Sequence, residues 1–120
     1  MDMKSFHQFR ENYDVYKHFS FKKDANEEDD KYAFRSIIVY KTKYKHSSGE
    51  VRDQQVAEMF PPNTLRSTDN RYEFLRQLDA YVKDLERKGA VILAVHPKGH
   101  PEYQKYIGGK AKGYVWKSAK

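Results

Sequence analysis

The chain has 120 residues, a net charge of +6, 15% aromatic residues and no cysteine. This length suits one domain with one hydrophobic core, and the aromatic content is higher than a disordered chain carries. The lack of cysteine excludes disulfides and thiolate metal sites, and the lack of an apolar leader or a long apolar run predicts a cytoplasmic protein that does not span a membrane.

Charge is distributed unevenly along the chain. Residues 22–30 carry two lysines and five acidic residues, so we interpret 22–31 as an acidic linker. From 31 to 52, and again from 98 to 120, six basic residues oppose one acidic residue. The second region lies within a basic C-terminal segment, 97–120, that is rich in glycine, lysine and aromatic residues. We expect both basic regions to flank a neutral helix–strand core in a single domain, 1–120.

The first predicted element is a helix from about Ser5 to His18. Ser5 and Gln8 have the spacing of a capping box, and aromatic residues then recur at helical intervals. These residues are Phe6, Phe9, Tyr13 and Tyr16. We interpret this stripe as a cover for the sheet; the alternative is that part of it docks a partner.

A strand is predicted from Tyr32 to His46, because β-branched and aromatic residues alternate there with period two. Its odd positions change from aliphatic residues to Lys41, Lys43 and Lys45, so its far end should be exposed. A turn is predicted at 47–50. Residues Val51–Phe60 then either return as an antiparallel strand, which we favour, or form a short helix.

The strongest helix signal covers about 70–88. Apolar residues recur at intervals of three and four, Asn70 and Glu73 match a capping box, and Gly89 follows where a left-handed residue ends a helix. The continuous apolar run Ala90–Val95 predicts a central strand that is covered on both faces. The predicted core residues are Phe34, Ile38, Leu75, Leu78, Val82, Leu85, Val91, Leu93 and Val95.

A short helix is predicted at Glu102–Ile107 and a last short strand at Tyr114–Trp116. Together these elements predict an α+β fold. We expect a mixed or antiparallel sheet of about three to four strands, packed on the long amphipathic helix and on the aromatic-striped N-terminal helix.

Few residues suggest catalysis. The glycine-rich GGKAKG segment matches no phosphate-binding loop, and no catalytic motif is present, so we expect a non-catalytic protein with no cofactor and no metal. The residue types needed for metal-independent RNA cleavage do follow the predicted central strand, and a ribonuclease is therefore an alternative function. Its candidate residues are His96, Lys98, His100 and Tyr103.

Basic and aromatic residues are interleaved in two segments, and this pattern is more informative. Lysine neutralises phosphate, and an aromatic ring stacks on an unpaired base. We therefore predict a basic module that binds single-stranded or distorted nucleic acid. The candidate binding residues are Tyr40, Lys41, Lys43, Tyr44, Lys45, Lys110, Lys112, Tyr114, Trp116 and Lys117.

Two other interpretations of these segments stay open. On an alternating strand the lysines and tyrosines face opposite sides, so the tyrosines would be core and the lysines a soluble edge. A small regulatory inhibitor or adaptor of the kind that phages and mobile elements encode, which binds a host protein, also fits the small size and the abundant tyrosine. The sequence leaves DNA, RNA or protein as the partner open, and also the oligomeric state.

Overall fold

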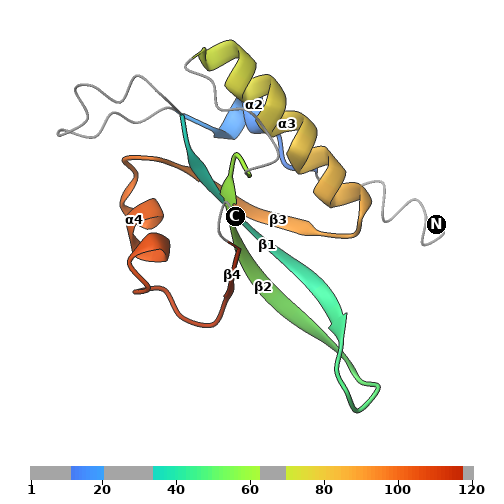
Figure 1. The fold of residues 1–120 in the computed structure, drawn as a ribbon. Coiled ribbons are helices and arrows are strands. Elements are labelled where there is room, and N and C mark those ends of the chain that lie inside the picture. The colour runs from blue at the N-terminus through green and yellow to red at the C-terminus, as the bar shows by residue number, and fades with distance from the viewer. Residues whose placement is uncertain (1–11, 21–33, 63–69, 118–120) are drawn as a thin grey trace.

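The computed structural model describes residues 12–20, 34–62 and 70–117 (Figure 1). In chain order the elements are α2 (Val15–His18), β1 (Ser36–Lys45), β2 (Val51–Phe60), α3 (Arg71–Arg87), β3 (Val91–Pro97), α4 (Pro101–Ile107) and β4 (Val115–Lys117). The four strands form one mixed sheet in the order β3-β1-β2-β4. The predicted α+β fold is therefore confirmed.

Some predictions fall outside the described residues. They concern the start of the N-terminal helix, 5–11, the acidic linker, 22–31, and the loop 63–68. Among the residues that are described, no helix is both long and apolar enough to cross a membrane.

β1 and β2 form a hairpin whose antiparallel register runs without interruption from Ser36 opposite Phe60 to Lys45 opposite Val51. At its turn, the Gly49 N–H donates to the His46 carbonyl at 2.8 Å, and Gly49 has a φ of 91°. Glycine adopts this left-handed conformation without strain, which explains the turn at SSGE. The predicted strand at Val51–Phe60 is confirmed, and the alternative helix there is wrong.

β1 is the strand that is covered on both faces. On one face, the α3 side, Ile38 packs with Leu78, Val82 and Phe60. On the other face, the α4 side, buried residues of β1 and β2 pack against Tyr103 of α4. These residues are Ile37, Val39, Ala57 and Met59. The sheet is thus the middle layer between α3 and α4 (Figure 1).

The prediction that Ala90–Val95 forms a central strand is wrong. β3 lies at an edge of the sheet, and Val91 and Leu93 are 37% and 43% exposed. Ile92 lies opposite Tyr40 and Ala94 opposite Val39, so Leu93 has no partner on β1 and forms a bulge. A bulge discourages the pairing of an edge strand with another chain. Apolar composition alone cannot distinguish a central strand from an edge strand that carries a bulge.

The other predicted core residues follow the expected pattern. Ile38, Leu78, Val82 and Val95 are buried. Phe34, Leu75 and Leu85 are partly buried and pack against them.

α3 begins and ends where its sequence signals predict. The Asn70 side chain accepts a hydrogen bond from the Glu73 N–H at 3.1 Å, and Gly89 has a φ of 99°. Four exposed basic residues of α3 and its C-cap pair with acidic residues one turn away. The pairs are Arg76–Glu73, Lys83–Asp79, Arg87–Asp84 and Lys88–Asp84. The helix therefore carries its own counter-charges.

Among the described residues, the predicted N-terminal helix is helical only at Val15–His18. Asp14 has an extended conformation, and its carboxylate accepts a hydrogen bond from the Lys17 N–H at 3.2 Å, so it caps a helix that begins at Val15. The helical stripe therefore does not continue through Tyr13. Val15 and Phe19 are buried in place of the predicted Tyr16, which is exposed. The predicted short helix and last strand are confirmed as α4 and β4.

Candidate nucleic-acid interface

The β1–β2 hairpin extends beyond the rest of the sheet as a two-stranded arm, residues 41–55 (Figure 1). The pairing of β1 with β3 ends at Lys41, and β4 pairs only with residues 56–58 of β2. Beyond these points, neither edge of the arm pairs with another described strand. The arm contains four basic and two acidic residues, which gives it a net charge of +2.

Three lysines form a row on one face of the arm. Lys41, Lys43 and Lys45 have the same parity along β1 as Ile37 and Val39, which lie in the α4-side cluster. Because side chains alternate along a strand, this lysine row (Lys41, Lys43 and Lys45) continues the α4 side of the sheet. Tyr44 lies on the α3 side of the sheet, and its register partner on β2 is Arg52.

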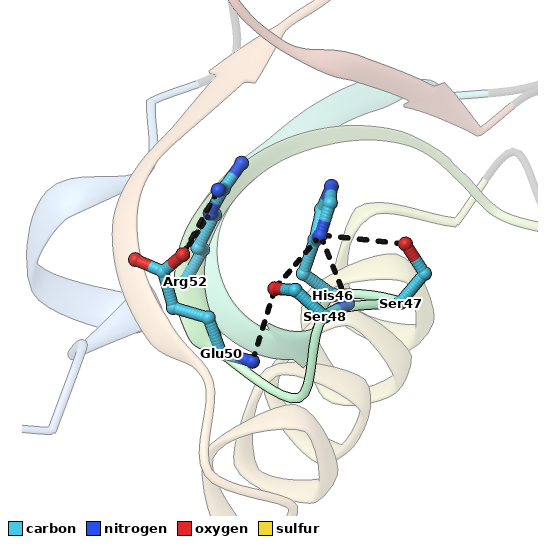
Figure 2. Close-up of polar contacts among 5 residues, drawn as sticks. All are labelled: His46, Ser47, Ser48, Glu50 and Arg52. Carbon is cyan, nitrogen blue, oxygen red and sulfur yellow. Dashed lines mark hydrogen bonds and ion pairs between the residues drawn. The ribbon is translucent and has the colours of Figure 1, made fainter.

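The tip of the arm is held by contacts among its own polar groups (Figure 2). The His46 Nδ1 accepts a hydrogen bond from the Ser48 N–H at 3.3 Å and lies 3.2 Å from the Ser48 Oγ. The Arg52 guanidinium donates to the Glu50 Oε2 from Nη2 at 2.9 Å and from Nε at 3.2 Å. The positive charge at the tip is therefore compensated, and the uncompensated charge of the arm lies in the lysine row.

β4 adds an aromatic residue to the α4 side. β4 runs parallel to β2 with Val115 opposite Val56, Trp116 opposite Ala57 and Lys117 opposite Glu58. Ala57 belongs to the α4-side cluster, so Trp116 shares the side of the lysine row, and it is 38% exposed. By the same register Lys117 belongs to the α3 side, away from this row.

Lys110 and Lys112 lie in the connection from α4 to β4. This connection must deliver Val115 beside Val56, where the arm leaves the sheet. Lys112 precedes Val115 by three residues, which limits its Cα to about 11 Å from that point. The Lys112 Cα therefore lies within about 11 Å of Val115, which pairs with Val56.

Two of the predicted binding tyrosines have internal roles. Tyr40 is only 3% exposed, and its hydroxyl donates to the Glu58 Oε1 at 2.8 Å, so it is a core residue without a free ring face. Tyr114 is partly buried; its ring packs edge-on against Tyr106 at 4.9 Å, and its hydroxyl donates to the Tyr106 carbonyl at 2.8 Å. As a correction, Tyr40 is removed from the candidate stacking residues.

Sequence reasoning missed Glu58. This carboxylate is 6% exposed on the α3 side and accepts hydrogen bonds from the hydroxyls of Tyr40 and Tyr81. Burial, and then the hydrogen bond to Glu58, raise the pKa of both tyrosines far above its usual range. The hairpin register offered the signal, because Glu58 lies between Val56 and Phe60 on the buried face of β2.

His96 and His100 do come together after β3. Their rings stack with centroids 5.2 Å apart, and His96 also stacks on Tyr106 at 6.1 Å. The His100 Nδ1 accepts a hydrogen bond from the Glu102 N–H at 3.1 Å and so caps α4. In this arrangement the His100 Nδ1 carries no proton. Burial, and then the proximity of His100, lower the pKa of His96.

This arrangement does not favour the ribonuclease alternative. General acid–base cleavage needs one group that gives a proton as well as one that takes it. The His100 Nδ1 accepts a hydrogen bond from the Glu102 N–H, and burial lowers the pKa of His96. Tyr103 is buried, with its hydroxyl 3.7 Å from the Met59 sulfur. The Lys98 N–H extends the β1–β3 pairing by donating to the Arg35 carbonyl at 2.9 Å. Within the described ranges, no three histidine, cysteine or acidic side chains are grouped as they would be around a metal ion.

Comparison with protein-family models, with curated proteins and with solved structures finds no match for this chain.

Proposed function

We propose that this protein binds single-stranded nucleic acid, without reading its base sequence, on the α4 side of its sheet. The observation that carries the proposal is the register of the sheet. It gives the lysine row and the exposed Trp116 the same side, which combines phosphate neutralisation with a ring for base stacking.

The distribution of ion pairs supports this proposal. Four exposed basic residues at α3 and its C-cap are paired with neighbouring carboxylates. In the lysine row, Lys43 pairs with Asp53 at 3.1 Å. The other lysines of the arm and of the C-terminal segment near β4 form no ion pair with any described residue. These are Lys41, Lys45, Lys110, Lys112 and Lys117.

The preference for single strands follows from Trp116. A ring stacks only on a base whose face is free, and duplex bases are already stacked on one another. Trp116, Ala57 and Val39 lie in register across three neighbouring strands, so Trp116 is about 10 Å from β1. The lysine row starts two residues beyond Val39. A strand whose phosphates follow the row therefore has its bases within reach of Trp116.

The alternative function, binding to a host protein, would also use this surface. Trp116 and the Tyr44 ring at the arm are both partly exposed, and exposed aromatic residues are common in protein interfaces. The two functions differ in their dependence on salt and on lysine charge, and this difference provides the test.

The test compares two variants that lose the same charge. The first replaces lysines of the proposed surface by glutamine: Lys41, Lys45, Lys110 and Lys112. The control replaces paired cations of α3 by glutamine: Arg76, Lys83, Arg87 and Lys88. Affinity for a labelled oligothymidylate is measured by fluorescence anisotropy over a series of salt concentrations. Each lost phosphate contact lowers the slope of log affinity against log salt by about 0.7.

We expect the first variant to lose up to about three units of slope and the control to keep the parental slope. Trp116→Ala should weaken binding by about 1–3 kcal/mol with an unchanged slope, because stacking releases few counterions. The proposal is wrong if the parent does not bind the oligonucleotide at low salt, or if both quadruple variants bind it equally. A host protein that is captured after nuclease treatment would then support the alternative.

A further inference from the structure

A pocket with a volume of about 310 Å³ lies at the edge of β3 that pairs with no described strand. It is lined by residues 94–97 of β3 and by Ser20. One wall contains Tyr13 and His18, and the other contains His96 and His100. The pocket is at the opposite edge of the sheet from β4, so it is separate from the surface with the lysine row and Trp116.

Aromatic rings form both walls of this pocket. Tyr13 and His18 have ring centroids 5.4 Å apart, and they flank Val15 in the layer on the α3 side. His96 and His100 have centroids 5.2 Å apart, and His96 lies opposite Ile37 on the α4 side. Two ring pairs therefore approach the edge of β3 from opposite sides of the sheet.

The edge of β3 provides hydrogen-bonding groups between the walls. The Lys98 N–H bonds to Arg35, and the register then directs the Val95 backbone groups away from β1, toward the free edge. Tyr13 and Val95 both line the pocket, and burial raises the pKa of the Tyr13 hydroxyl. No described residue donates to the Val95 carbonyl.

His100 adds a hydrogen-bond donor. Its Nδ1 accepts from the Glu102 N–H, which leaves Nε2 as the ring nitrogen that can donate. Burial lowers the pKa of His96, and the His96 ring already stacks on both His100 and Tyr106. His100, Tyr13 and His18 are therefore the rings left for stacking on a flat heterocycle. The volume lies at the lower end of the range for small-ligand sites and suits a group of the size of a base or nucleoside.

We infer that this pocket binds one unpaired nucleobase, held between the two ring pairs with its polar edge against β3. The inference deepens the proposed function. It rests on that function only in naming a bound strand as a source of the base. A strand that leaves the lysine surface could supply the base, and a free nucleotide could equally supply it.

The first measurement follows the histidine ring signals of the full chain by NMR during titration with AMP and with ribose 5-phosphate. These probes share the sugar and the phosphate and differ in the base. We expect AMP to shift the signals of His18, His96 and His100 saturably, and ribose 5-phosphate to leave them in place. His46 at the tip of the arm is the internal control and should not shift. Equal shifts with both probes would show a phosphate site and overturn the inference.

The second measurement uses His100→Asn. Asparagine keeps an acceptor that can cap α4 and removes the imidazole ring. We expect this variant to bind AMP about fivefold more weakly or worse, as the loss of one stacked ring predicts, whereas His46→Asn binds as the parent does. If His100→Asn does not fold, His18→Ala tests the opposite wall, because His18 is exposed and its truncation leaves the core intact. Parental AMP affinity in the folded variant would contradict the inference.

An oligothymidylate titration separates this inference from the proposed function. If the oligonucleotide binds the lysine surface and neither it nor AMP shifts the three histidines, the pocket assignment is wrong and the proposed function stands. If AMP shifts them and no oligonucleotide binds, the pocket assignment stands and the proposed function is wrong. Shifts with the oligonucleotide alone identify the polymer as the source of the base.

Discussion

Replacing Tyr40 by phenylalanine removes only the hydroxyl that donates to Glu58. The ring stays in its place in the core, so no cavity of the size of a side chain is created. The Glu58 carboxylate is 6% exposed, and its bond to the Tyr40 hydroxyl is 2.8 Å long. A hydrogen bond to a charged group contributes about 1.5–3 kcal/mol. We expect Tyr40→Phe to lower the free energy of unfolding by this amount, and Tyr81→Phe by less, because water can reach the partly buried Tyr81.

The assay is urea denaturation followed by circular dichroism, with Tyr72→Phe as the matched control. Tyr72 is 85% exposed, so the loss of its hydroxyl should leave stability unchanged. A double-mutant cycle with Glu58→Gln then tests the cause, because the effect of Tyr40→Phe should shrink when the acceptor is no longer a carboxylate. The reasoning is refuted if Tyr40→Phe is no more destabilising than Tyr72→Phe.

Three further predictions concern stability. The pKa values of the Tyr40 and Tyr81 hydroxyls are raised in the folded protein, so the unfolded chain releases these protons first as the pH rises. Stability should therefore fall above about pH 10. Urea denaturation of the double phenylalanine variant should show no such dependence. The lowered pKa of His96 means that the unfolded chain binds the proton first as the pH falls, so stability should decrease below about pH 6.5; an equally steep decrease in His96→Gln would contradict this. Leu78→Ala should cost about 2–5 kcal/mol because Leu78 is fully buried, whereas Leu93→Ala at the bulge should cost much less, and similar denaturation midpoints for the two would show that the core is misplaced.

Local signals predicted the elements that depend on a few neighbouring residues. Asn70, Glu73 and Gly89 bound α3 because capping groups and a left-handed glycine act within one turn of the helix. Gly49 makes the turn of the arm for the same kind of reason. The alternation of lysine and tyrosine along β1 also predicted that the two residue types face opposite sides, because successive side chains of a strand point in opposite directions.

The sequence by itself thus determined the α+β class, α3, the hairpin and the exposure of the lysine row. Only the tertiary structure decided which strand is central, because β1 and Ala90–Val95 are both apolar and the order of strands depends on pairing between distant segments. It also decided that Tyr40 is a core donor to Glu58 while Trp116 shares the side of the lysines. The pocket beside β3 joins rings that are about 80 residues apart, and such a site arises from the packing of the N-terminal segment on a sheet edge, which no local pattern encodes.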